Sequence, residues 1–316
     1  MKRLLLVTCS LLVLMLFGTS LALASELPGP RPDLVEGAQL YDKWYAALGT
    51  DAPQGDMPLW SRQSSNTRSG AETWRCAECH GWDYKGAQGA YASGSHATGF
   101  PGLLAAAARM SRDDIVSSLK DGQEAQHDFS PYIPENAMQK IAIFLKEGLI
   151  DDSEYINPLS LKVIDGDAAH GGELYAAVCA TCHGADGTQI IFRTEGVDET
   201  LADAANRDPF RFLHRTRFGV AGTEMPVGYE LGWTPADGRD VLMYAQSLAR
   251  GKENAAVTGA GQGSGESREA APPTSLWTGI LTGIGAFFVT FGSALLILTG
   301  LLLAGAAVVV ILRRKK

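Results

Sequence analysis

Cysteine is scarce in this sequence, and basic residues and strand patterns are also few. The chain has five cysteines in 316 residues, too few for the dense disulfide framework that small secreted domains use. Lys and Arg total 27 against 35 Asp and Glu, which argues against nucleic acid as a partner, because phosphates attract basic surfaces. Alternating apolar and polar runs are almost absent. We therefore expect an all-α fold.

Both ends of the chain carry signals for a membrane. Residues 1–24 combine a basic start, an apolar run and small residues at a cleavage position, which predicts a secretory signal peptide. Residues 276–312 contain no charged side chain, and residues 313–316 are all basic. A single transmembrane anchor fits the positive-inside rule better than a hairpin of two spans, because it leaves the basic tail in the cytoplasm. Residues 251–275 have the composition of a flexible linker.

This topology predicts a single-pass protein of the cytoplasmic membrane, with residues 25–250 on its periplasmic or extracellular side. Residues 25–312 carry a net charge of −14 when the basic residues of the two ends are set aside. Such a surface would attract a partner with a basic docking face. Solubility alone is the other explanation of the charge.

An internal repeat divides the exported part into two domains, residues 25–155 and 156–250. The pentapeptide at 37–41 is echoed at 171–175, and each copy precedes a Cys-x-x-Cys-His motif. Capping residues and apolar spacing predict further helices. Two of them follow Ser111 and Asp208, and two others cover residues 134–147 and 235–249.

The first domain carries an insertion, residues 46–75. Tyr41 lies 35 residues before Cys76, whereas Tyr175 lies four residues before Cys179. Most long insertions form surface loops. The alternative is a segment that covers one edge of a bound group or docks a partner.

The two motifs indicate the chemistry of the protein. They consist of Cys76, Cys79 and His80 and of Cys179, Cys182 and His183. Covalent heme attachment needs two thiols for the porphyrin vinyl groups and an adjacent imidazole for the iron, which this spacing supplies. A redox disulfide or a zinc site would not require histidine at that position twice. The sequence therefore predicts two covalently bound heme c groups, with His80 and His183 as iron ligands.

The second domain resembles the class I cytochrome c family. The resemblance rests on Gly172-Glu173-Leu174-Tyr175, on the motif at 179–183, on Met225-Pro226 and on a final helix with Tyr244. It implies that Met225 is the distal iron ligand. It also implies that the final helix packs across the first, with Tyr244 near Tyr175.

The first domain resembles the same family only in part, because it has no Met-Pro pair. Aligning the two domains on their second and last helices places His127 opposite Met225. We therefore expect His127 to be the distal ligand of the first heme, which would then have two histidine ligands. The alternatives are His96, Met110 and Met138.

Other residues near these motifs have expected roles that the structure can test. Three aromatic residues flank the first motif and are expected to wall its pocket: Trp74, Trp82 and Tyr84. A basic cluster on one helix is expected to face solvent, or else a heme carboxylate: Arg211, Arg215 and Arg217, with His214 among them.

These features predict a diheme electron carrier for respiratory redox partners outside the cytoplasmic membrane. Two iron atoms with six ligands each leave no position for a substrate. A methionine ligand raises the potential relative to histidine, so electrons would run from the first heme to the second. The alternatives are an oxidoreductase with an open sixth site at the first heme, and a heme subunit of a larger respiratory complex.

Overall fold

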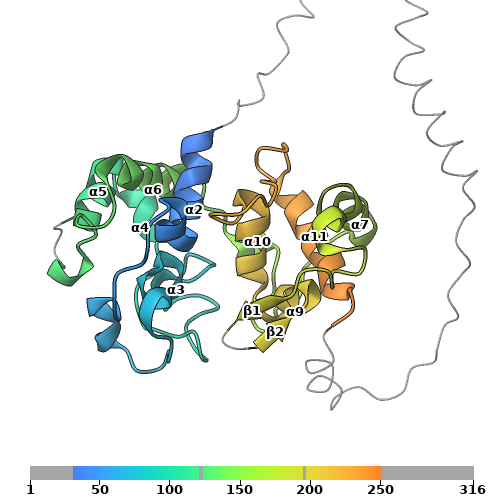
Figure 1. The fold of residues 1–316 in the computed structure, drawn as a ribbon, viewed down its shortest axis with the longest axis horizontal. Coiled ribbons are helices and arrows are strands. Elements are labelled where there is room, and N and C mark those ends of the chain that lie inside the picture. Colours follow the sequence, from blue (N-terminus) through green and yellow to red (C-terminus); the bar gives the residue numbers. More distant parts are fainter. Residues whose placement is uncertain (1–30, 121–123, 195–196, 251–316) are drawn as a thin grey trace, which may run out of the picture. The chain divides into compact units, whose positions relative to one another are not determined.

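The computed structural model describes residues 31–250, apart from 121–123 and 195–196 (Figure 1). The predicted signal peptide, linker, membrane anchor and basic tail all lie outside these residues. Within the described part of the chain, no helix is both long enough and apolar enough to cross a membrane.

The described chain is mainly helical, as predicted. The α-helices are α2 (Pro32–Ala47), α3 (Cys76–His80), α4 (Leu104–Arg109), α5 (Arg112–Lys120), α6 (Glu135–Glu147), α7 (Ala168–Leu174), α8 (Ala180–His183), α9 (Leu201–Arg207), α10 (Pro209–Phe218) and α11 (Pro235–Ser247). Short 3-10 turns cover Pro58–Arg62, Gly70–Trp74, Ala125–His127 and Asp152–Glu154, and a π-helical turn covers Tyr175–Cys179. A small antiparallel hairpin, β1 (Phe192–Thr194) with β2 (Val197–Glu199), was not expected.

Local capping explains where the predicted helices begin. Ser111 and Asp114 exchange backbone-to-side-chain hydrogen bonds at the start of α5. The Asp208 carboxylate accepts a hydrogen bond from the Arg211 amide at the start of α10, and Pro209 fills the first helical position. Both arrangements satisfy amide groups that have no partner inside the helix. The sequence predictions for these two helices are confirmed.

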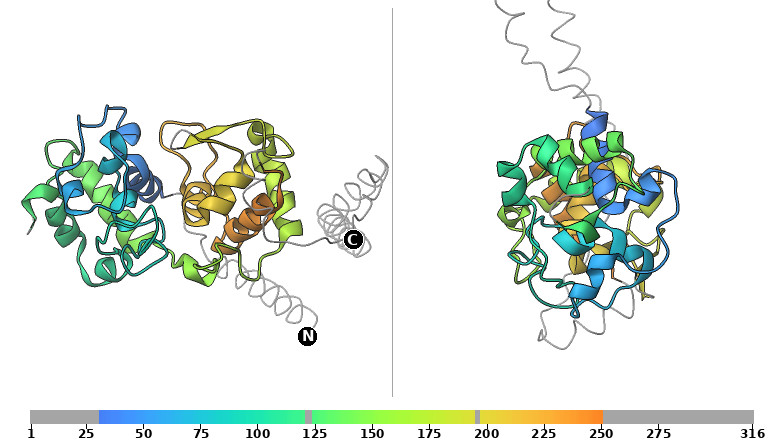
Figure 2. Two further views of the ribbon diagram at one scale, coloured as in Figure 1. Left: turned by 90° about the horizontal axis from the view of Figure 1, so that it is seen from below. Right: turned by 90° about the vertical axis from the view of Figure 1, so that its left-hand side faces the viewer.

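The repeated pentapeptide lies where two helices cross, once in the first half (residues 31–155) and once in the second half (156–250). Figures 1 and 2 show α2 against α6 and α7 against α11. A Cβ atom at Gly37 would lie 2.0 Å from the Lys140 carbonyl oxygen, and one at Gly171 would lie 1.9 Å from that of Asp240. Glycine is therefore required at both crossings, because any side chain would push the helices apart.

The tyrosine that ends each pentapeptide has the same partner in both halves. The Tyr41 hydroxyl donates to the Gly81 carbonyl at 2.6 Å, and the Tyr175 hydroxyl donates to the Gly184 carbonyl at 2.6 Å. Each glycine directly follows a Cys-x-x-Cys-His motif, so the tyrosine ties the first helix of its half to the motif. Tyr244 lies with its ring centroid 5.2 Å from that of Tyr175, as the family resemblance implied.

Helix α10 of the second half packs against α2 of the first half, and this buries residues that were expected to face solvent. His214 is 0% exposed and Arg217 is 6% exposed. The His214 Nε2 lies 3.0 Å from the Ala38 carbonyl oxygen, which can only accept, so Nε2 carries the proton. Nδ1 therefore accepts from the Tyr84 hydroxyl at 2.7 Å. The prediction of an exposed His214 was wrong because its partners come from the other half.

Burial of His214 predicts a dependence of stability on pH. Burial lowers the pKa of His214 to about 4, with Asp42 opposing and Arg215 and Arg217 adding to the shift. The folded protein therefore holds this histidine neutral, and stability falls as the pH drops from about 6.5 to about 4, by up to about 3 kcal/mol. Urea unfolding midpoints should fall more steeply over this range for the wild type than for His214→Gln. Parallel pH profiles would contradict this expectation.

Candidate functional site

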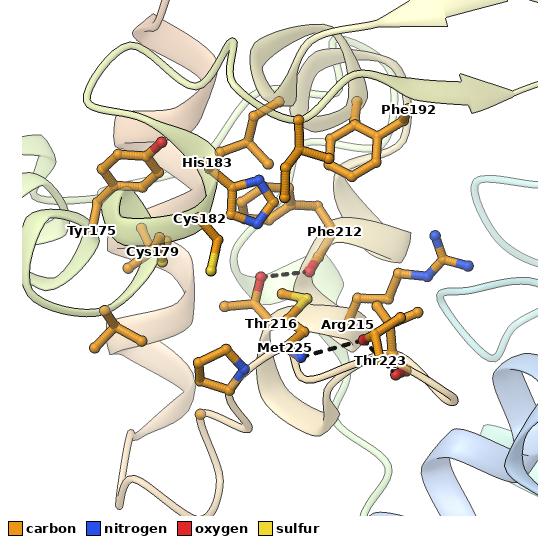
Figure 3. Close-up of a pocket in the computed structure, with 18 of the residues that line it drawn as sticks. Tyr175, Cys179, Cys182, His183, Phe192, Phe212, Arg215, Thr216, Thr223 and Met225 are labelled. Carbon is orange, nitrogen blue, oxygen red and sulfur yellow. Dashed lines mark hydrogen bonds between the residues drawn. The ribbon is translucent and has the colours of Figure 1, made fainter.

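The motif at 179–183 opens into a pocket of about 490 Å³ in the second half, referred to below as the second pocket. Figure 3 shows the side chains of Cys182, His183 and Met225 pointing into it. The two cysteines and His183 come from α8 and the turn before it, and Met225 comes from the loop between α10 and α11. Phe192 and Glu199 of the hairpin add a further wall.

The electrostatics of the second pocket suit a metal ligand and an anionic group. Burial lowers the pKa of His183, which favours the neutral imidazole that binds metals. Its Nδ1 is buried without a hydrogen-bond partner among the described residues. Arg211 and Arg215 also line the pocket, so two of the three clustered arginines are part of its wall. Guanidinium groups in this position can pair with carboxylates.

The motif at 76–80 opens into a pocket of about 500 Å³ in the first half, referred to below as the first pocket. Cys76, Cys79 and His80 lie on α3, and His127 ends the 3-10 turn that follows α5. Burial raises the pKa of the Cys76 and Cys79 thiols to about 12 each. Neutral thiols with a neighbouring imidazole are the groups that covalent heme attachment uses.

His80 and His127 both line the first pocket, with ring centroids 6.2 Å apart and ring planes at 84°. Two metal–nitrogen bonds of about 2 Å each, together with the radii of the two rings, span about 6 Å. The Nδ1 of His80 lies 2.7 Å from the Pro101 carbonyl oxygen, and the Nδ1 of His127 lies 3.0 Å from that of Ser118. Within the described chain each ring thus keeps Nε2 available for a metal, as metal-bound histidines do. The two residues fit one iron between them.

Of the alternative ligands His96, Met110 and Met138, only Met110 is among the described residues that line the first pocket. Met57 and Met110 line the first pocket, whereas the residues that line it within the described chain do not include His96 or Met138. Met138 is 1% exposed on α6 and belongs to the apolar core. The Nε2 of His96 lies 3.1 Å from a guanidinium nitrogen of Arg68.

The insertion at 46–75 forms a wall of the first pocket rather than a detached surface loop. Met57, Leu59 and Trp74 line the pocket and are nearly buried. Arg62 donates to the Glu124 carboxylate at 2.6 and 3.1 Å. This ion pair joins the insertion to the segment that carries His127, which also lines the pocket. Sequence reasoning left this role open, because apolar residues within a polar insertion were the only signal.

Two of the three aromatic residues expected to wall the first pocket lie elsewhere. Trp74 is part of the lining, but Trp82 and Tyr84 contact His214 of α10, at 5.3 Å between ring centroids for Trp82. The prediction that Trp82 and Tyr84 wall the first pocket was wrong, because the chain turns sharply at Gly81, which has φ +78°. The residues that follow are directed to the other half.

Comparison with known proteins agrees with the geometry of the second pocket. Residues 166–242 match the family model for subunit III of the cbb3-type cytochrome c oxidase. The match contains Cys179, Cys182, His183 and Met225, and it covers about a quarter of the chain. No curated protein matches the sequence. Residues 166–242 are therefore a domain of the cytochrome c family, which implies covalently bound heme c and heme-based electron transfer.

Proposed function

We propose that the chain is a membrane-anchored diheme cytochrome c that carries single electrons between redox partners. Each pocket would hold one heme c, on Cys76 and Cys79 in the first half and on Cys179 and Cys182 in the second. Heme supplies reversible one-electron chemistry at iron, with a potential that its axial ligands tune. His183 and Met225 would ligate the iron of the second pocket.

The close approach of His80 and His127 at the first pocket is the observation that supports this proposal most. Both rings are fixed through Nδ1 to backbone carbonyls, and their centroids lie 6.2 Å apart at the first pocket. Such fixed ligands stay in place when the charge of the iron changes by one unit. A site with two protein ligands has no position for a substrate, so the arrangement favours electron transfer over catalysis.

Binding of carbon monoxide tests this point. We expect the reduced wild-type protein to show no change in its absorption spectrum under carbon monoxide without denaturant, because both iron atoms hold two protein ligands. The His127→Ala variant is the positive control and should bind carbon monoxide at one heme. If the wild type binds carbon monoxide at the first heme, the alternative of an oxidoreductase with an open site gains support.

Anchoring belongs to the same proposal and rests on the sequence at 276–312. The apolar run without charges and the basic tail favour one span with both pockets outside the cytoplasm. A chain ending at Lys252 should be exported, soluble and loaded with both hemes, whereas the full chain should fractionate with membranes. If the shortened chain still sediments with membranes, the anchor lies elsewhere.

A second candidate follows from the matched family, whose name describes a subunit of an oxidase. The chain would then be a heme subunit fixed in a larger respiratory complex. Native electrophoresis of membranes in mild detergent separates the two proposals. A free carrier should migrate at the size of one or two copies of this chain, and a subunit should comigrate with the other members of its complex.

A further inference from the structure

A single buried carboxylate connects the walls of the two pockets. Asp42, on α2 of the first half, is 0% exposed. Its Oδ2 accepts from Arg215 Nε at 2.8 Å and its Oδ1 from Arg215 Nη2 at 3.1 Å. Oδ1 also pairs with Arg75 Nη2. Arg215 lines the second pocket and Arg75 lines the first.

The same two arginines share one aromatic ring. The guanidinium carbon of Arg75 lies 5.2 Å from the centroid of the Trp82 ring, and that of Arg215 lies 5.4 Å from it. Both distances are within the range of cation–π interactions. Trp82 is 1% exposed. Asp42 and Trp82 thus each contact both arginines, while Arg75 also pairs with Glu72 and Glu78 and Arg215 stays 28% exposed.

Charge keeps this cluster together. Burial alone would raise the pKa of Asp42, but Arg215 and Arg75 more than offset this and hold it well below its ordinary value. Asp42 is thus an anion in the folded protein, and it compensates one guanidinium from each half. Removing it would leave Arg215 without its carboxylate partner, while Arg75 would keep Glu72 and Glu78.

Other bonds between the halves lie outside this cluster. Gln39 Nε2 donates to the Phe218 carbonyl at 2.9 Å, and Arg217 pairs with the buried Asp152 at 2.7 Å. His214 adds its bonds to Tyr84 and Ala38. Several independent bonds therefore hold α10 against the first half.

We infer that Asp42, Arg75, Arg215 and Trp82 form the internal path by which an electron passes between the two sites. Hydrogen bonds and ion pairs link Arg75, Asp42 and Arg215 from the wall of one pocket to the wall of the other, and cation–π contacts link both arginines to Trp82. In the transfer, one site is oxidised as the other is reduced by the same electron, and no bond or proton moves. The inference rests on the proposed function, since it requires heme in both pockets. Asp42 acts as a positioning residue.

Rapid reduction of the oxidised protein by a pulse of radicals provides the test. The electron then redistributes between the two sites in a first-order phase whose rate is independent of protein concentration. For Asp42→Asn we expect this phase to slow several-fold. We also expect both midpoint potentials to rise, because a negative charge near both sites is lost and the reduced states become easier to form.

Asp152→Asn is the matched control. It removes an equally buried carboxylate from an ion pair with α10, but neither Asp152 nor Arg217 is among the lining residues of the two pockets in the described chain. It should loosen the contact between the halves without changing the internal rate or either potential. If Asp42→Asn fails to fold, Arg215→Lys keeps the charge but loses the two-bond geometry, and it should slow the same phase.

The outcomes separate this inference from the proposed function. Internal transfer that is unchanged in the folded variant, or slowed equally by Asp152→Asn, overturns the path through Asp42. A wild-type protein that carries only one heme overturns the proposed function itself, which a heme assay of the same sample detects.

Discussion

Replacing Cys179 and Cys182 with alanine should remove the heme of the second pocket and leave that of the first pocket in place. The thioether bonds of c-type heme require these thiols, and the two pockets have separate walls. About half of the covalent heme should therefore be lost. Acidic acetone extraction, followed by a heme stain and by the intact mass of the protein, measures the remainder.

The matched control removes the two cysteines of the first half instead. Cys76→Ala with Cys79→Ala should remove the other heme and keep the one ligated by Met225. If either double variant retains two covalent hemes, or if the wild type releases heme into acetone, the assignment of that motif is wrong. Loss of both hemes from one variant would instead mean that the halves do not fold independently.

Exchanging the distal ligands should shift the two potentials in opposite directions. Axial ligands help to set heme potentials over a range of about 0.8 V, so a Met/His site and a His/His site should differ by about 0.1 V or more. Methionine favours the reduced iron relative to histidine. Met225→His should therefore lower the upper wave of a redox titration, and His127→Met should raise the lower wave.

Each variant serves as the control of the other, because the wave of the unchanged site should move little. His96→Met is a further control, since His96 is not among the residues that line the first pocket in the described chain. If His96→Met shifts the lower wave and His127→Met does not, His127 is not the distal ligand of the first heme.

Local sequence signals were sufficient to predict where α5 and α10 begin. Ser111 with Asp114 and Asp208 with Pro209 satisfy helix ends within four residues, so their effect does not depend on the rest of the fold. The repeat was also informative, because Gly37 and Gly171 lie at equivalent helix crossings in the two halves. Alignment of the halves placed His127 opposite Met225, and the structure brings His127 into the first pocket.

The contact between the halves could not be predicted in the same way. Arg215 looked like a solvated residue on a basic helix, because its partner Asp42 lies 173 residues away in the sequence. The burial of His214 and the position of Trp82 depend on the same contact. Strands β1 and β2 have three residues each, too short for an alternating pattern to be recognised.

Near-infrared magnetic circular dichroism of the fully oxidised wild-type protein tests the central claim most directly, because the energies of its charge-transfer bands distinguish methionine from histidine as distal ligand. The proposal predicts two low-spin hemes in equal amounts, one with Met/His ligation and one with two histidines. Only the charge-transfer band of the Met/His heme should disappear in Met225→Ala. A single type of band, two Met/His bands, or a high-spin heme in the wild type would contradict the proposed pair of sites.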